Sequence, residues 1–214
     1  MLTQQHIVIN GKHQKPIVID VSYSENKTNL PVIIFCHGYK GFKDWGAWDL
    51  MAKAFAEAGF FFVKFNFSHN GGTAEQPIDF PDLEAFGNNN YTKELDDLET
   101  VLDWISSNTK FENKLNLSHI NLIGHSRAGG IVTIKSEEDN RIKKVISLAG
   151  VSSFGKRTST TGDLNQWKKD GVDLPGETAQ TYAATESGAY SVEVICLVTA
   201  YRCIDCSCSC WINC

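Results

Sequence analysis

The fold is decided by one stretch of the chain, Ile120-Asn121-Leu122-Ile123-Gly124-His125-Ser126-Arg127-Ala128-Gly129-Gly130. The stretch begins with a mostly apolar run of the length of a buried strand and ends in small residues suited to a tightly packed helix. Gly124 allows a sharp turn between the two, at a backbone cost of roughly 1–3 kcal/mol. A serine at the apex of a strained strand-to-helix turn is typical of a nucleophile. The stretch therefore predicts a nucleophile elbow with Ser126 as the attacking residue.

A second motif lies upstream, Val32-Ile33-Ile34-Phe35-Cys36-His37-Gly38, a strand that ends in a His-Gly pair. Together the two motifs resemble the α/β-hydrolase fold family, in the branch of dienelactone-hydrolase-like and prolyl-oligopeptidase-like serine hydrolases, over about residues 1–155. The elbow departs from G-x-S-x-G at Ala128, and Gly129 and Gly130 after it keep the region small. The resemblance implies a three-layer α/β fold, mostly parallel, with an N-terminal antiparallel hairpin and a truncated C-terminal end.

The resemblance also implies a reaction and its site. Ser126 would cleave ester or amide bonds through an acyl-enzyme, and an oxyanion donor is typically worth about 2.7–4 kcal/mol. The backbone N–H groups of Arg127, directly after the nucleophile, and of Tyr39, in the loop after the His-Gly pair, are the expected donors. His37 shapes that loop close to the substrate. His69 follows a neighbouring strand and is expected to contact the substrate at the same sheet edge.

The rest of a catalytic triad is missing from the pattern. In the family an acid and then a histidine follow the nucleophile; the candidate acids here are Asp163, Asp170, Asp173 and Asp205. No histidine follows His125. In subtilisin, loss of the triad histidine costs about six orders of magnitude in turnover. We therefore expect little or no activity from this polypeptide, and the alternative is a catalytically inactive hydrolase-fold binding module.

The composition and charge of the chain restrict the classes of partner that it is expected to bind. The chain has 214 residues, of which 42% are hydrophobic and 21% charged, and a formal net charge of −5. This is the balance of an ordinary globular protein, and scattered lysines without a basic patch argue against nucleic acid or an anionic membrane as a partner. No apolar run reaches the length of about 18 residues that spans a membrane. The expectation is a cytoplasmic protein that acts on a small-molecule or peptide substrate without a cofactor.

Cysteines gather at the end of the chain, at positions 196, 203, 206, 208, 210 and 214. Three interpretations are open for them. A disulfide framework needs an oxidising compartment that the N-terminal residues do not indicate. A soft-metal or thiol site could use the C-x-x-C spacing of Cys203 and Cys206. The favoured interpretation is a non-native, frame-shifted tail, and no metal site is assigned.

Three segments are expected along the chain: a hydrolase core over 1–155, a partial lid or disordered segment over 156–190, and the cysteine-rich tail over 191–214. Within the core, Asn10-Gly11 predicts a hairpin between strands at 6–9 and 16–21. Further strands are expected at 32–35, 60–67, 120–123 and 144–148, and one more at 192–198. Strands that alternate with helices predict a parallel sheet.

Helices are expected from Asp44 to a C-terminal cap at Gly59, from an N-cap at Thr92, and from the elbow to about Ser136. The second helix has an apolar face of Leu95, Leu98, Leu102 and Ile105. The acidic runs at 94–97 and 137–139 are interpreted as solvated surface rather than as metal ligands.

Overall fold

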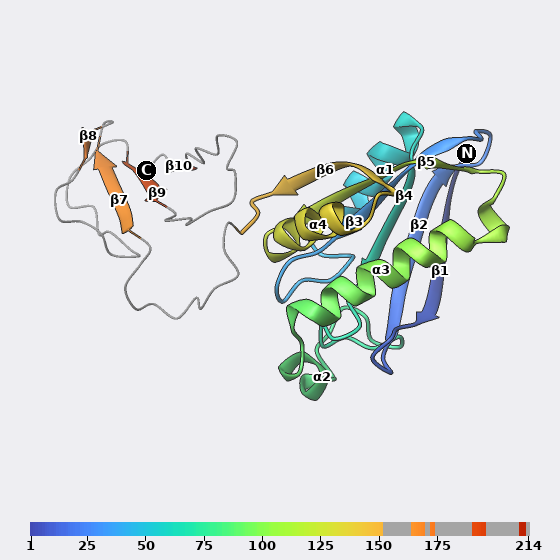
Figure 1. The fold of residues 1–214 in the computed structure, drawn as a ribbon, viewed down its shortest axis with the longest axis horizontal. Helices are drawn as coiled ribbons and strands as arrows, with labels where there is room; N and C mark the ends of the chain where they lie inside the picture. Colours follow the sequence, from blue (N-terminus) through green and yellow to red (C-terminus); the bar gives the residue numbers. More distant parts are fainter. Residues whose placement is uncertain (152–163, 170–171, 174–189, 196–209, 213–214) are drawn as a thin grey trace. The chain divides into compact units, whose positions relative to one another are not determined.

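A computed structural model describes residues 1–151, 164–169, 172–173, 190–195 and 210–212 (Figure 1). Its contacts divide the chain into two units, Met1–Phe154 and Gly155–Cys214. Each unit is described by itself.

The first unit is built on a six-stranded sheet in the order β1-β2-β4-β3-β5-β6. Its strands are β1 (Leu2–Asn10), β2 (Pro16–Ser24), β3 (Leu30–Cys36), β4 (Phe61–Asn66), β5 (Leu115–His125) and β6 (Ile142–Leu148). β3 pairs in parallel with β4 and β5, and β5 with β6, whereas β1 and β2 pair antiparallel. The predicted mostly parallel sheet with an N-terminal hairpin is confirmed. The carboxyl ends of β3, β4, β5 and β6 therefore meet at one edge.

Helices cover both faces of this sheet, which gives the three predicted layers (Figure 1). The helical elements are α1 (Trp48–Ala58), α2 (Leu83–Gly87), α3 (Tyr91–Ser107), the short 3₁₀ turn η1 (Thr109–Phe111) and α4 (Arg127–Glu138). α3 and α4 bury apolar side chains against one face of the sheet. α1 packs on the other face, where Ala52 joins Phe35 and Phe62.

Two predicted helix starts are wrong. α1 begins at Trp48 rather than Asp44, because Asp44 belongs to the loop after β3, where it binds lysines. α3 is capped by Asn90 rather than Thr92: the extended backbone of Asn90 lets its side chain accept a bond of 3.0 Å from the N–H of Lys93. The Gly59 cap is confirmed, with the left-handed φ of 99° that glycine adopts without strain.

A buried ion cluster lies on the α1 face of the sheet. Lys64, in the middle of β4, contacts Asp44, Asp49 and Asp20. Lys43 adds bonds of 2.5 Å to Asp20 Oδ2 and 2.6 Å to Asp44 Oδ2. Both lysine side chains are almost fully buried. Burial alone would raise the pKa of Asp44, but the bonds from the two lysines outweigh it and the pKa lies below its ordinary value. The loop after β3 is thus tied to the sheet by charge.

The acidic run at 94–97 is only partly on the surface, which corrects the interpretation of a solvated helix face. Glu94 and Asp97 are buried. They lie on the same side of α3 as Leu98 and Val101, since residues three or four apart share a helix face. The two carboxylates therefore face the sheet and the loops at its carboxyl edge.

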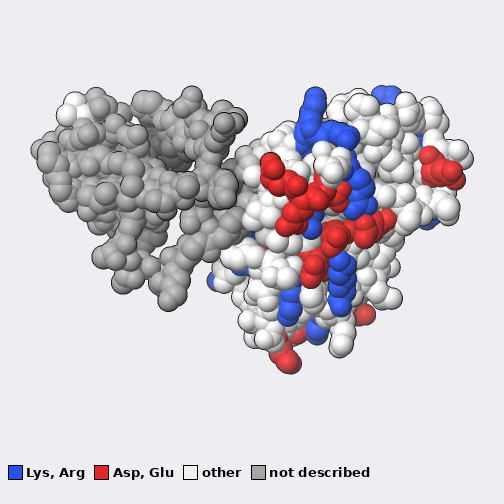
Figure 2. Space-filling view, viewed as in Figure 1, with Lys and Arg blue, Asp and Glu red and all other residues white. Residues whose placement is uncertain are grey.

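Charges of both signs intermingle on the face of the first unit seen in Figure 2. Ion pairs along α3 join Lys12 to Glu99 and Arg141 to Asp103. Among the described residues, no helix has the length and hydropathy needed to cross a bilayer.

The second unit contains an antiparallel sheet in the order β10-β9-β7-β8. Its strands are β7 (Leu164–Lys169), β8 (Val172–Asp173), β9 (Tyr190–Ile195) and β10 (Cys210–Ile212). β9 overlaps the strand expected at 192–198, while β7 lies within the segment expected to be a lid or disordered. Of the six tail cysteines, Cys210 alone falls within the described residues.

The ion cluster yields a test of what fixes this face of the sheet. Replacing Lys64 by alanine removes the buried cation that Asp20, Asp44 and Asp49 share and leaves Lys43 as the only lysine of the cluster. We therefore expect the free energy of unfolding to fall by about 3 kcal/mol. Lys53→Ala is the control, because Lys53 is exposed and its Nζ lies 3.9 Å from Glu57 Oε1, a surface pair worth about 0.5 kcal/mol. Urea denaturation measures both; equal losses would contradict the structural role of the cluster.

Candidate active site

The chain turns sharply between β5 and α4, and Ser126 stands at the turn. Its backbone has φ 54° and ψ −120°, a combination that costs a non-glycine residue about 1–3 kcal/mol. Hydrogen bonds hold it there: the N–H of Ser126 donates to Leu148 O at 2.8 Å, and its carbonyl accepts from Gly129 at 2.9 Å and Val151 at 3.2 Å. The strain is therefore maintained by the end of β6 and the first turn of α4.

The hydroxyl of Ser126 is not used as a helix cap. Although Ser126 is the N-cap residue of α4, its side chain makes no capping hydrogen bond. An ordinary capping serine accepts a bond from the N–H two or three residues later. The Ser126 side chain is partly exposed at the carboxyl edge of the sheet, where it can meet a ligand.

Small residues let β5 and α4 approach closely at the elbow. A Cβ at Gly124 would lie 2.3 Å from the carbonyl oxygen of Ala128 and 2.6 Å from its carbonyl carbon. Ala128 is itself completely buried without conflict. At Gly129, a Cβ would lie 2.4 Å from the Oγ of Ser147 on β6. The structure thus needs glycine at 124 and 129 and accepts alanine at 128.

The loop after β3 packs directly against the elbow. A Cβ at Gly38 would lie 2.9 Å from the Cβ of Ser126 and 3.0 Å from the carbonyl oxygen of His125, so the two backbones nearly touch. The Tyr39 N–H, next along this loop, donates to no acceptor among the described residues. The Arg127 N–H lies in the first turn of α4, where no intrahelical acceptor exists. The structure brings the predicted nucleophile and the loop of its predicted oxyanion donor together.

His37 is a structural part of this loop. Its Nδ1 lies 2.9 Å from the carbonyl oxygen of Gly38, and its Nε2 accepts from the Phe67 N–H at 3.2 Å. An acceptor role for Nε2 requires the tautomer that carries its proton on Nδ1. Burial lowers the pKa of His37 to about 4. His37 is therefore a neutral histidine that joins the end of β3 to the end of β4, with both ring nitrogens engaged.

Side-chain amides fix the same loop from the β4 side. Asn66 Oδ1 accepts from the Lys43 N–H at 2.6 Å, and Asn66 Nδ2 donates to Pro77 O at 2.8 Å. Asn70 Nδ2 donates to Gly41 O at 3.2 Å. The loop that carries Tyr39 is thus held at several points by hydrogen bonds with Asn66 and Asn70.

His69 lies in a different environment from Ser126. Its Nδ1 is 2.8 Å from Ser68 Oγ, and its ring meets the ring of His13 edge to face at 6.1 Å. Burial lowers its pKa to about 4. Asp97 Oδ2 accepts from the Ser68 N–H at 2.7 Å, and burial raises the pKa of Asp97 to about 6. These contacts join His69 to the β1–β2 hairpin and α3; none of them reaches the elbow.

Two groups of aromatic rings belong to the elbow and to the loop that packs against it. The ring of His125 packs 5.2 Å from the ring of Trp48 and 6.5 Å from that of Trp45. The ring of Tyr39 lies 5.6 Å from that of Phe86 on α2. Trp45 and Tyr39 are both more than half exposed, so their rings are free to contact apolar parts of a ligand.

One pair of residues at this edge was not anticipated from the sequence. Arg127 Nε donates to Glu94 Oε2 at 2.9 Å, and Asn89 Nδ2 donates to Glu94 Oε1 at 2.8 Å. Burial raises the pKa of Glu94, against the opposing effect of Arg127. The signal was present in the sequence, because Glu94 stands four residues before Leu98 on the apolar face of its helix.

The candidate triad acids fall almost wholly outside the part of the chain that the structure describes. Asp163, Asp170 and Asp205 lie outside the described residues, and of Asp173 only its place in β8 is described. Within the part of the chain that the structure describes, no cluster of three or more histidine, cysteine or acidic residues has the arrangement of a metal site. Cys203 and Cys206 also fall outside that part.

Comparisons with known proteins identify the family and the fold. The family model described as "alpha/beta hydrolase fold" matches residues 31–188. The chain belongs to the alpha/beta hydrolase fold family. A curated relative, an uncharacterized 31.7 kDa protein of the traX-finO intergenic region in Escherichia coli, is 24% identical over 160 residues, which cover 74% of this chain and 50% of that protein. The chain thus spans about half the length of the curated relatives it matches.

Solved structures with the hydrolase fold are also similar to this chain. A dienelactone hydrolase from Anabaena variabilis has a TM-score of 0.56 at 15% identity, covering 70% of this chain and 64% of that one. An acetyl xylan esterase from Paenibacillus has a TM-score of 0.53 at 20% identity, covering 67% of this chain and 48% of that one. At these identities the similarity establishes the fold.

The close approach at Gly124 predicts a large effect for a single methyl group. Gly124→Ala places a Cβ against backbone atoms of Ala128 that cannot move alone, so we expect the unfolding free energy to fall by about 2–3 kcal/mol. Gly87→Ala is the control, because a Cβ there meets no atom within 4 Å. It should leave the stability unchanged or raise it by about 0.5–1 kcal/mol. Thermal or urea unfolding measures the stability of both variants. If Gly124→Ala were as stable as the wild type, the close packing of Gly124 against Ala128 would be ruled out.

The low pKa of His37 predicts a pH dependence of stability. The unfolded chain takes up a proton near the ordinary pKa of 6.5, whereas the folded chain resists protonation down to about 4. The stabilisation that neutral His37 gives to the folded chain is therefore complete above pH 6.5 and is lost as the pH falls. Between pH 7 and pH 5 we expect its contribution to the free energy of unfolding to decrease by about 2 kcal/mol.

Comparison with His37→Gln isolates this contribution from that of Asp97, whose raised pKa acts in the opposite sense. The difference in unfolding free energy between the wild type and His37→Gln should shrink by that amount when urea denaturation is moved from pH 7 to pH 5. A difference that does not vary with pH would mean that His37 is not buried in its neutral form.

Proposed function

We propose that this chain carries the nucleophile and the oxyanion site of a serine hydrolase that acts on ester or amide bonds. One observation carries the proposal: a serine hydroxyl with no capping bond stands on a strained turn beside a fixed loop. A strained backbone persists only where the surrounding structure enforces it, and such residues cluster at active sites. A small-molecule or peptide substrate fits the partly open edge, and no step of this chemistry needs a cofactor.

The chemistry follows from the arrangement. Ser126 Oγ attacks the substrate carbonyl carbon, an Oγ–C bond forms, and the carbonyl π pair moves to oxygen. The N–H groups of Tyr39 and Arg127 would hold that oxyanion. As the tetrahedral species collapses, the leaving group takes up the proton lost from Ser126 Oγ and departs as an alcohol or amine. The acyl-serine that remains is then hydrolysed by water to the free acid and the serine hydroxyl. The similar dienelactone hydrolase and acetyl xylan esterase support ester substrates in particular.

The hydroxyl proton needs an acceptor, and no histidine follows Ser126 in the 214 residues. A serine without a base is a poor nucleophile. This observation favours a second candidate function, a binding module that uses the hydrolase fold without turnover. The two candidates differ in whether Ser126 can be acylated or phosphonylated at all.

A fluorophosphonate probe separates them. We expect slow labelling of Ser126, found by mass spectrometry of the digested protein, because the oxyanion donors act without the base. Imidazole in the buffer should accelerate it at least 10-fold, since a general base typically contributes 10²–10⁴-fold and a diffusing one recovers part of this. Ser126→Ala should abolish labelling.

Ser68→Ala is the matched control, because Ser68 lies at the same sheet edge but is buried against His69. Its labelling should equal that of the wild type. A folded wild-type chain that stays unlabelled with and without imidazole would favour the binding module.

A further inference from the structure

The side chain of Arg127 is placed unusually for a residue that follows a nucleophile. Its guanidinium carbon lies 4.1 Å from the centre of the Tyr91 ring and 6.0 Å from that of the Tyr39 ring. Only 17% of the side chain is exposed, and its Glu94 partner is 5% exposed. Cation–π contact and a buried carboxylate together fix the guanidinium against α3, next to the loop that carries Tyr39.

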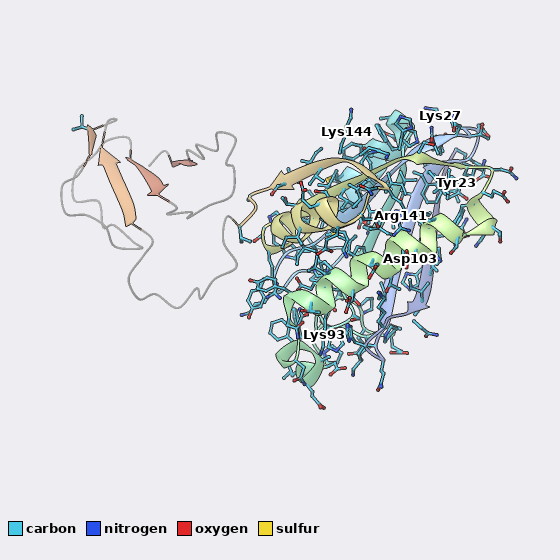
Figure 3. All side chains as sticks on the ribbon, in the orientation of Figure 1. Tyr23, Lys27, Lys93, Asp103, Arg141 and Lys144 are labelled. Atoms are coloured by element: carbon cyan, nitrogen blue, oxygen red, sulfur yellow. The ribbon has the colours of Figure 1, made fainter. Side chains whose placement is uncertain are left out.

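Most of the hydrogen-bonding capacity of this guanidinium is unused. An arginine has five N–H donors. Within the described residues, Nε of Arg127 donates to Glu94, while Nη1 and Nη2 donate to nothing. Arg141, labelled beside Asp103 in Figure 3, shows the contrast: its Nε, Nη1 and Nη2 all have partners, among them Asp139 and Ser106. Arg141 is a structural arginine, whereas Arg127 has donors to spare.

The unused donors of Arg127 reach solvent, because no Arg127 nitrogen is among the buried side-chain atoms of the described residues that lack a hydrogen-bond partner. A ligand that takes the place of water on these donors must supply acceptors of its own. Glu94 compensates the charge through Nε, and Asn89 satisfies the other oxygen of Glu94. Both carboxylate oxygens of Glu94 therefore have a hydrogen-bond donor, and the Nε group of Arg127 has an acceptor. The two Nη groups remain available to an acceptor on a ligand.

The position of these donors identifies what they would bind. Arg127 supplies one proposed oxyanion N–H, and its guanidinium contacts the ring of Tyr39, which supplies the other. The guanidinium thus belongs to the residue directly after Ser126 and lies beside the ring of Tyr39 in the neighbouring loop. A planar carboxylate accepts two parallel bonds from an arginine, a geometry that a lysine cannot offer.

We infer that Arg127 is a specificity residue that binds a carboxylate of the substrate, so that the substrates are esters or amides that also carry a free carboxylate. Glu94 and Asn89 act through Arg127 as positioning residues. The inference rests on the proposed function, because it takes Ser126 as the reacting centre.

Equilibrium binding tests the inference without turnover. The probes are monomethyl succinate, which has a carboxylate, and dimethyl succinate, its neutral counterpart, each titrated into the full chain at pH 7 and followed by NMR. We expect the wild type to bind the monoester at least 10-fold more tightly than the diester. A difference of this size follows from the typical strength of a charge-assisted, bidentate pair of hydrogen bonds. Ser126→Ala should keep this preference, since the carboxylate is bound by another residue.

Three variants assign the preference to the guanidinium. Arg127→Lys keeps the charge beside Glu94 but loses the planar fork, and should weaken monoester binding about 10-fold. Arg127→Gln combined with Glu94→Gln leaves no unpaired buried charge and should abolish the preference, with diester affinity unchanged. Lys40→Gln is the matched control, because Lys40 is exposed and lies 5.7 Å from the centre of the same Tyr39 ring. It should change monoester affinity less than 2-fold.

Equal affinity for the two esters, undetectable binding of the monoester, or a preference that survives in the double variant would each overturn the inference; thermal unfolding checks that the variants fold. The outcome is separable from that of the fluorophosphonate test. A preference that depends on Arg127 in a chain that is never labelled would support the carboxylate site and contradict the acyl-enzyme. Labelling of Ser126 in a chain that binds the two esters equally would support the acyl-enzyme and contradict the carboxylate site.

Discussion

The site depends on one backbone conformation, the positive φ of Ser126. A serine does not adopt φ 54° with ψ −120° on its own, so neighbouring residues must stabilise this conformation. The Leu148 carbonyl, the Gly129 N–H and the Val151 N–H do this with three hydrogen bonds. The same turn aligns the Arg127 N–H and brings the loop at Gly38 against the serine. If the turn relaxed, the Ser126 hydroxyl, the loop at Gly38 and the Arg127 side chain would lose their common geometry.

Much of the fold could be predicted because it follows from local patterns. Alternating apolar runs and helical periodicity predicted the six strands of the first sheet and three of its helices, and Asn10-Gly11 predicted the hairpin. Helix starts were predicted less well, since Asp44 is recruited by lysines distant in sequence and Asn90 competes with Thr92 as a cap. Lys64 shows the same limit: a lysine in an aromatic strand is buried here because three carboxylates from β2, the loop after β3 and α1 converge on it.

The site could be predicted only in its backbone part. The elbow and the His-Gly loop are sequence motifs, and the structure places Gly38 against Ser126. The pairing of Arg127 with Glu94 joins residues 33 positions apart and depends on how α3 packs beside the elbow. The acidic run at 94–97 was interpreted as solvated surface because charged side chains are usually exposed. Its spacing from Leu98 nevertheless places Glu94 and Asp97 on the buried face of α3. His69 was predicted from the shared sheet edge, but the strand order sets it beside the hairpin.

The spacing of small residues after Ser126 has a practical consequence for finding related chains. A Cβ is tolerated at 128, which is alanine, but at 129 it would collide with Ser147, and at 124 with the first turn of α4. The steric demand in this protein is thus for glycine two residues before and three residues after the serine. Searches that insist on the usual pentapeptide signature would pass over such sequences, whereas a hexapeptide signature that leaves the fifth position open to alanine and requires glycine at the sixth would retrieve them.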